Sequence, residues 1–162
     1  MSSTRALVTL SRVSDCHWFV WFDNVMPILP STENSLLVRT AFSDAKAWAG
    51  ALAAVQTENE DGFRAYVEVI DDISWENADW EQVRRAALAT DEQAAVLFIA
   101  DSPALEPDYP VMVVDLSDLS HEPFRCVASE LWGVDNNLNI ANMDWEEFAD
   151  MAEDDGVFRG FA

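Results

Sequence analysis

Hydrophobic and polar positions alternate along this chain with two different periods, and each change of period marks a new element. Compact apolar runs, which are typical of strands, occur at five places after residue 34: SLLVRT, FRAYVEVIDD, AAVLFIAD, VMVVDLS and FRCVA. Apolar residues spaced three and four apart, which are typical of amphipathic helices, occur in three segments: FSDAKAWAGALAAV, ADWEQVRRAALAT and DWEEFADMAED. The chain is therefore predicted to contain both strands and helices.

The order of these elements predicts an α/β fold. Strands separated by helix-length segments form parallel βαβ units, whereas short connections between the later strands favour antiparallel pairing. We therefore expect a mixed, partly parallel sheet flanked by about three helices. Asp44, or Ser43, is placed to cap the first helix, while Asp144 and Glu147 have the spacing of a capping box at the last one. Gly156 stands where a left-handed cap would end that helix.

The first 34 residues differ from the rest of the chain. ALVTL and HWFVWF predict an N-terminal strand pair, and VMPILPSTENS, which contains two prolines, predicts a connector. We expect an N-terminal β extension and connector over residues 1–34 and a single α/β domain over residues 35–162. The strand pair could join the main sheet or a second chain, so a homo-oligomer formed through it remains open.

The chain is strongly acidic, with 30 Asp and Glu against nine Lys and Arg and a net charge of -21. The acids are spread along the sequence rather than gathered in a tail. Such a body is repelled by nucleic acids and anionic membranes and attracts basic proteins or metal ions, although the same charge can serve solubility alone. No signal peptide or membrane-spanning run is visible, and Cys16 and Cys126 read as buried free thiols. We therefore expect a cytoplasmic protein with no nucleic-acid or membrane partner.

Aspartates at the ends of predicted strands are the strongest candidates for chemistry. Asp71, Asp101 and Asp115 each stand at the end of an apolar run. In open parallel sheets ligands bind beyond the carboxyl ends of the strands, and converging carboxylates there would hold Mg²⁺ or Ca²⁺. Against this, no Gly-rich loop stands ready to hold a phosphate, and aspartate commonly caps turns. No other cofactor is expected.

Tryptophans in predicted loops are candidates for partner binding. An aromatic ring bordered by carboxylates binds arginine or lysine by cation–π attraction and ion pairing together, although ordinary packing is the competing interpretation. The side chains that combine these properties in the polar segments and in the acidic last helix are Trp75, Asp79, Trp132, Asp135, Asp144, Glu146 and Glu147. Glu147 is the weakest of these, because capping can occupy it.

Four asparagines stand close together in DNNLNIANMD, at positions 136, 137, 139 and 142. Asparagine tolerates left-handed backbone and bonds neighbouring amides, so we expect a tight connector held by these side chains. The alternative is a polar recognition surface beside Trp132 and Asp135.

Four segments carry a resemblance to a known family: LLVRTAFSDAKAW, FRAYVEVIDD, PVMVVDL and WGVDNNLNIANMDWEEFADMAEDDGVFRGF. They resemble a family of uncharacterised actinobacterial proteins that is described only as a domain of unknown function. The resemblance covers about residues 35–161 and leaves the first 34 residues outside it. It implies a cytosolic α/β protein, of actinobacterial or phage origin, and brings no catalytic residues with it.

The sequence contains no GxSxG, GxGxxG or P-loop motif, so an enzymatic role is less expected than a binding role. We predict an acidic protein-binding module, such as an inhibitor, an immunity protein or a complex subunit, that docks a basic protein partner. The first alternative is a divalent-metal-dependent hydrolase or phosphotransfer enzyme that uses the strand-end aspartates. The second is a DNA mimic, which needs carboxylates arrayed along one elongated face.

Overall fold

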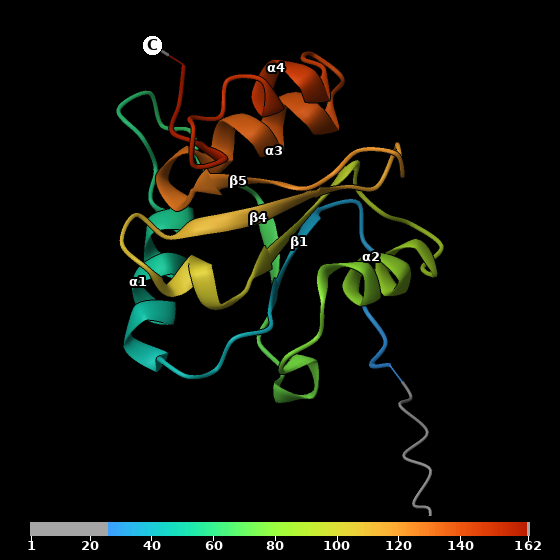
Figure 1. Ribbon diagram of the computed structural model, residues 1–162. Helices are drawn as coiled ribbons and strands as arrows, with labels where there is room; N and C mark the ends of the chain where they lie inside the picture. Colours follow the sequence, from blue (N-terminus) through green and yellow to red (C-terminus); the bar gives the residue numbers. More distant parts are fainter. Residues whose placement is uncertain (1–25, 162) are drawn as a thin grey trace, which may run out of the picture.

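A six-stranded mixed sheet forms the centre of the computed structural model, which describes residues 26–161 (Figure 1). The strands are β1 (Ser35–Arg39), β2 (Val67–Ile70), β3 (Val96–Ala100), β4 (Pro110–Asp115), β5 (Phe124–Val127) and β6 (Val157–Phe158). Their order across the sheet is β2-β1-β3-β4-β5-β6. β1 is parallel to β2 and β3, β4 is antiparallel to β3 and β5, and β6 is parallel to β5. The predicted mixed α/β fold is confirmed.

Helices cover both faces of the sheet. α1 (Ala45–Gln56), α3 (Leu131–Asn139) and α4 (Trp145–Ala149) pack on one face, and α2 (Trp80–Leu88) packs on the other (Figure 1). Three short 3-10 turns complete the elements: η1 (Ile73–Trp75), η2 (Ser102–Leu105) and η3 (Ala128–Glu130). Because successive strand residues point to opposite faces, the neighbours Leu97 and Phe98 are fully buried in two separate cores. No helix within residues 26–161 has the length and apolar character needed to cross a membrane.

The helix starts predicted from the sequence are present. Asp44 caps α1, where its side chain accepts a hydrogen bond from the Ala47 N–H at 2.8 Å. At α4 the Asp144 N–H donates to Glu147 Oε2 at 2.7 Å, as a capping box requires. Gly156 has the expected left-handed backbone, with φ of 77°, but α4 ends seven residues earlier at Ala149. This glycine instead turns the chain into β6.

The asparagine-rich stretch is helical as far as Asn139, where the prediction of a connector is wrong. Residues 140–144, in contrast, form the turn before α4, in which Asn142 Nδ2 donates to Asn137 Oδ1 at 2.7 Å. The first part of the stretch belongs to α3, which runs from Leu131 to Asn139. Buried Leu131 and Val134 and half-buried Leu138 have helical spacing, and their burial against the sheet outweighs the low helix propensity of asparagine. Asn137 Nδ2 also donates to the Gly133 carbonyl, one turn back, at 2.7 Å.

Buried Asp135 and its neighbour Asn139 join α3 to the amino ends of the three parallel strands. The Asp135 Oδ1 accepts from Ser35 Oγ at 2.6 Å, at the first residue of β1, and its Oδ2 accepts from the Tyr66 N–H at 2.8 Å, just before β2. Asn139 Nδ2 donates to the same carboxylate at 2.9 Å. The Asn139 Oδ1 then accepts from the Ala95 N–H at 2.9 Å, just before β3. One helix is thereby fastened to three strands.

The predicted connector lies against the α2 side of the sheet. Leu29 is 2% exposed and belongs to the core on that side. Glu92 exchanges two hydrogen bonds with the connector, donating its N–H to Ser31 Oγ at 2.9 Å and accepting from the Thr32 N–H at 3.2 Å. The predicted strands ALVTL and HWFVWF, with Cys16, lie outside the described residues. The division at residue 34 stays a prediction.

We expect Asp135→Ala to lower the free energy of unfolding by roughly 2–4 kcal/mol, because it leaves the buried Ser35 hydroxyl and the Tyr66 N–H without their acceptor. Urea unfolding of the variant and the wild type measures the difference. Asp154→Ala, at an exposed aspartate, is the matched control and should change stability by no more than about 0.5 kcal/mol. Equal stabilities of the two variants would contradict the role assigned to Asp135.

Candidate functional site

A stacked pair of accessible aromatic rings lies beside α3. The ring centroids of Phe63 and Trp132 are 5.6 Å apart, and their planes differ by 15°. Phe63 is 49% exposed and Tyr66 is 56% exposed, while Trp132 is half-buried. The backbone of Tyr66 is held by Asp135, which lies about one turn along α3 from Trp132. We call the stacked rings of Phe63 and Trp132 the aromatic patch.

The loop between α1 and β2 holds Phe63 in place. Asn59 Oδ1 accepts from the N–H groups of Asp61 and Phe63 at 3.0 and 2.9 Å, and the Asn59 N–H donates to the Phe63 carbonyl at 2.8 Å. Gly62 supplies the left-handed backbone, with φ of 82°, that this tight loop needs. Figure 1 shows the loop on the same side of the sheet as α3. Phe63 therefore stands on a loop that is ordered by its own hydrogen bonds, while Trp132 stands on α3.

Carboxylates accompany the aromatic patch. Glu58, Glu60 and Asp61 are exposed in the loop that carries Phe63. In the same segment, Arg64 lies over the ring of Tyr66, with its Cζ 5.4 Å from the ring centroid, which is an example of a guanidinium held on an aromatic face. Aromatic faces next to negative charge are suited to binding arginine and lysine side chains.

The structure divides the partner-contact residues predicted from the sequence. Burial excludes Trp75, which is 1% exposed, and Asp135, which is 3% exposed. η1 turns the ring of Trp75 into the α2-side core, and the Asp135 carboxylate is enclosed by its hydrogen bonds. Among the remaining predicted contact residues, Trp132 is half-buried. The other four are exposed: Asp79, Asp144, Glu146 and Glu147. Phe63 was missed, because only its stacking on Trp132 of α3 marks it.

The three aspartates predicted as metal ligands do not converge. Asp101 follows the last residue of β3, whereas Asp115 pairs with Val96, the first residue of β3. Antiparallel β4 thus carries Asp115 to the opposite end of the sheet from Asp101. Asp71 follows the end of β2, which is parallel to β1 as β3 is, so it lies at the Asp101 end.

Arginines hold the two aspartates at the carboxyl end. Asp71 accepts from Arg39 Nη1 and from Trp48 Nε1, both at 3.0 Å. Asp101 receives both guanidinium nitrogens of Arg125, at 2.8 and 2.7 Å. These bonds satisfy the carboxylate charge that a cation would otherwise neutralise. In the part of the chain that the structure describes, no three or more His, Cys, Asp or Glu side chains are grouped to hold a metal ion.

The surroundings of Asp115 were also missed by sequence reasoning. Its Oδ2 lies 2.7 Å from His121 Nδ1, and His121 Nε2 lies 3.2 Å from Glu146 Oε1. The His121 ring stacks on buried Trp145, with centroids 5.5 Å and planes 6° apart. These residues line a cavity of about 250 Å³ together with Asp118. The six-residue separation of Asp115 and His121 was the only available signal, since Trp145 and Glu146 of α4 reach His121 through the tertiary fold alone.

Contacts with carboxylates raise the pKa of His121. The hydrogen bond that His121 Nδ1 donates to Asp115 is the largest cause, desolvation opposes it, and the charges of Asp118, Asp115 and Glu146 add to the increase. In the charged form both ring nitrogens donate, one to Asp115 and the other to Glu146. His121 therefore ties the loop after β4 to α4 most strongly when it is protonated.

We expect millimolar Mg²⁺ or Ca²⁺ to leave the melting temperature unchanged, because Arg39 and Arg125 already compensate Asp71 and Asp101. Thermal unfolding of the wild type and of Asp101→Asn, with and without each cation, measures this. An increase in the wild type that disappears in Asp101→Asn would instead support the metal-dependent enzyme.

We expect His121→Gln to destabilise the protein more in acid than in base. The contribution of a group with a raised pKa is fully present below its unfolded pKa, about 6.5 for histidine, and is lost as the pH rises through the folded pKa. Urea unfolding of both proteins at about pH 5.5 and about pH 9, on either side of that range, measures the difference. A loss of the same size at both pH values would show that the His121 charge contributes nothing.

Comparison with known proteins supports the resemblance seen in the sequence. A family model described as "Domain of unknown function (DUF6924)" matches residues 34–161. No curated protein matches the chain. The matched range includes the whole sheet, all four α-helices and the aromatic patch. The chain therefore belongs to the DUF6924 family of domains of unknown function.

Proposed function

We propose that this protein is an acidic binding module that docks a basic protein partner through the aromatic patch. The observation that carries the proposal is the accessible Phe63–Trp132 stack, with centroids 5.6 Å apart, beside the exposed carboxylates of its loop. Large aromatic side chains are among the residues that contribute most to protein interfaces. An inhibitor, an immunity protein or a subunit of a complex would each use such a surface.

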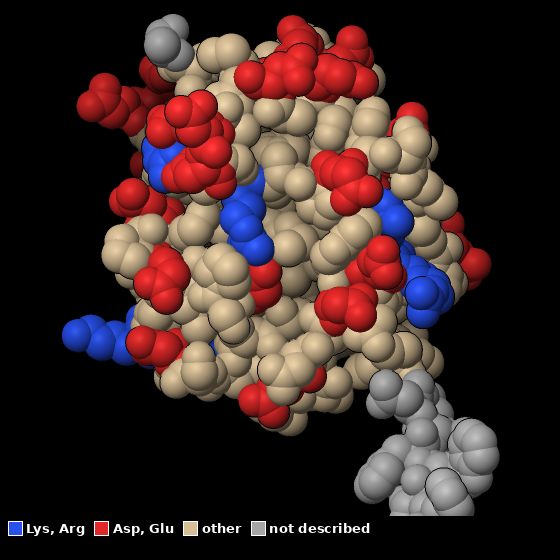
Figure 2. All heavy atoms as spheres, viewed as in Figure 1, with Lys and Arg blue, Asp and Glu red and all other residues tan. Residues whose placement is uncertain are grey.

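The charge distribution supports attraction of a basic partner. Figure 2 shows carboxylates in several groups over one face of the molecule, with few cationic side chains between them. Arg39, Arg125 and Arg159 are each paired with carboxylates of the same chain, and the other cationic side chains within residues 26–161 are few beside the excess of carboxylates: Lys46, Arg64, Arg84 and Arg85. With a net charge of -21, the protein would steer a basic partner toward itself over long range.

The patch is suited to retain what the charge attracts. A partner arginine or lysine would lie on an aromatic face, as Arg64 lies on Tyr66, and pair with a neighbouring carboxylate. Asn59 holds the backbone of Phe63, and α3 carries Trp132, before any partner arrives. Less conformational freedom is then lost on binding, so a larger part of the contact free energy remains as affinity.

The cellular location, the origin and the oligomeric state of the protein are part of the same proposal. The family resemblance and the acidic composition support a cytoplasmic protein of actinobacterial or phage origin, and the predicted N-terminal strands supply a route to a homo-oligomer. The DNA-mimic alternative requires one elongated array of carboxylates. On the face drawn in Figure 2 the acidic groups are separated by uncharged surface, which supports the binding module instead.

We expect Trp132→Ala to weaken partner binding at least about tenfold, which corresponds to roughly 1.4 kcal/mol. Affinity capture from the host lysate, read by mass spectrometry at low and high salt, identifies the partner, and titration calorimetry with the purified partner gives the affinity. Raising ionic strength from about 0.1 to about 1 M shortens the Debye length from about 10 to about 3 Å and should weaken capture.

Leu119→Ala is the matched control, because Leu119 is an accessible apolar residue, 57% exposed, that lies outside the aromatic patch. It should capture the partner as the wild type does. Capture that ignores salt would remove the electrostatic part of the proposal. Equal binding by Trp132→Ala and Leu119→Ala would remove the aromatic patch from it.

A further inference from the structure

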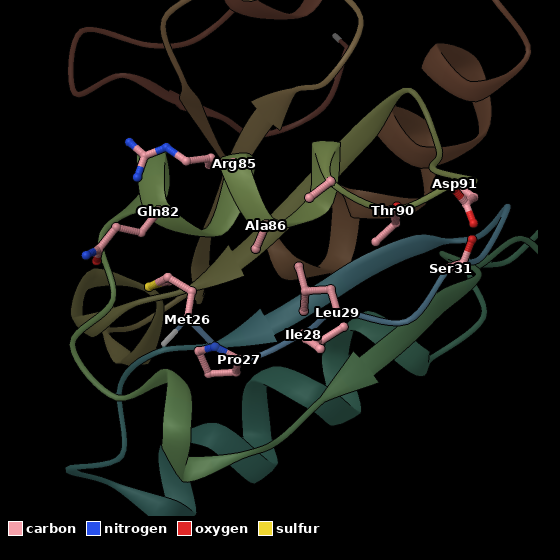
Figure 3. Close-up of a pocket in the computed structure, with 11 residues that line it drawn as sticks. Met26, Pro27, Ile28, Leu29, Ser31, Gln82, Arg85, Ala86, Thr90 and Asp91 are labelled. Atoms are coloured by element: carbon pink, nitrogen blue, oxygen red, sulfur yellow. The ribbon is translucent and has the colours of Figure 1, made fainter. Parts of the chain in front are cut away.

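An apolar groove of about 610 Å³ lies between α2 and the connector (Figure 3). Ala86 and Ala89 form part of the wall on the α2 side, and Ile28 and Leu29 form part of the opposite wall. Leu29 is buried beneath the groove, but Ile28 is 93% exposed, which is unusual for so large an apolar side chain. The groove therefore offers an apolar surface large enough to receive several side chains.

The two ends of the groove are distinct. Met26 and Pro27 lie toward Gln82 and Arg85, whereas Ser31 lies beside Asp91 at the other end (Figure 3). The residues that immediately precede Met26 in the sequence are thus attached at the Arg85 end. Between Gln82 and Leu88 the helix supplies about 9 Å of wall, and a six-residue extended segment is about 20 Å long. Such a segment would span the groove.

We propose that residues 17–22, HWFVWF, of the same chain fold back along the groove and fill it. This stretch is followed by Asp23 and Asn24, two residues that favour turns, and then by Val25 and Met26. A reversal at the turn directs the aromatic stretch from the Arg85 end toward the Ser31 end. In an extended segment Trp18, Val20 and Phe22 share one side, which supplies the apolar face that the groove requires.

The covalent connection favours this segment over a second copy of the chain. Three residues separate Phe22 from Met26, so closing the loop costs little entropy and the local concentration of the segment is high. The turn also brings a charge of the right sign. Asp23 is three residues from Met26, at the end where Arg85 lies, and within residues 26–161 Arg85 forms no ion pair. The occupant thus matches the groove in apolarity and charge, and its six residues equal in number the connector stretch from Met26 to Ser31 that borders the groove.

This inference is independent of the proposed function. The groove is lined by α2, whereas the aromatic patch is built on α3 across the sheet. Loss of partner binding through the patch would leave the groove occupied, and an empty groove would leave the patch intact.

A spin label on Cys16 of the full chain tests the proposal. Cys126 is fully buried and burial raises the pKa of its thiol, so a thiol-specific label reacts at Cys16. Residues 16 and 17 are adjacent, which places the label next to the docked stretch. We expect the amide NMR signals of Ala86 and Ala89 to lose most of their intensity, while exposed Ala53 on α1 keeps its signal.

Two further samples make the result decisive. Ala86→Glu puts a charge in the groove and should restore the Ala89 signal, while Ala53→Glu, the matched change on α1, should leave the loss as it is. Isotope-labelled Cys16→Ser mixed with spin-labelled, isotope-free protein reports contacts between molecules and should show no loss. Undiminished Ala86 and Ala89 signals in the labelled chain would overturn the proposal. Equal loss in the mixed sample would also overturn it, because a second copy would then be the occupant.

Discussion

The hydrogen bonds of Asp135 are the constraint on which the rest of the structure depends. They join α3 to Ser35 and Tyr66, which are 100 and 69 positions away in the chain. Burial raises the pKa of Asp135, while the bonds from Ser35, Tyr66 and Asn139 lower it and only partly offset that effect. Burying the charged carboxylate therefore costs free energy. What the carboxylate contributes is specificity of the fold, because only one placement of α3 gives Ser35, Tyr66 and Asn139 their acceptor. The position of Trp132, and with it the aromatic patch, follows from that placement of α3.

Five of the six strands, α1, α2 and α4 could be predicted because their signals are local, whereas β6, which has only two residues, was missed. An apolar run such as SLLVRT marks a strand that is covered on both faces, and the helical spacing around Trp48 marks the side of α1 that packs on the sheet. Each pattern is complete within its own segment. α3 could not be predicted from its asparagines, since their usual roles are in turns. Asn139 is accommodated in the helix because it bonds Ala95 and Ser35, 44 and 104 positions away, and no local pattern contains those partners.

The candidate sites were predicted less completely, for two physical reasons. Exposure is a tertiary property, so the polar neighbours of Trp75 gave no sign that η1 turns its ring into the core. Strand direction decides where strand-end residues meet. The short connection after β3 had already favoured an antiparallel β4, and that direction by itself carries Asp115 away from Asp101. The expected convergence of the carboxylates was thus in conflict with the fold predicted from the same sequence.

Charge acts on this molecule in two opposite ways. Arg39 and Arg125 neutralise Asp71 and Asp101 at the carboxyl end of the sheet. The net charge of -21 is the excess of carboxylates over all cationic side chains, and no positive charge of the protein compensates it. Self-repulsion among those carboxylates opposes the compact state, whereas the same field attracts a basic partner. Added salt screens both effects, and it therefore favours the folded state while it weakens the complex. Binding that is lost at high salt consequently reports on the interface, because unfolding would need the opposite change in ionic strength.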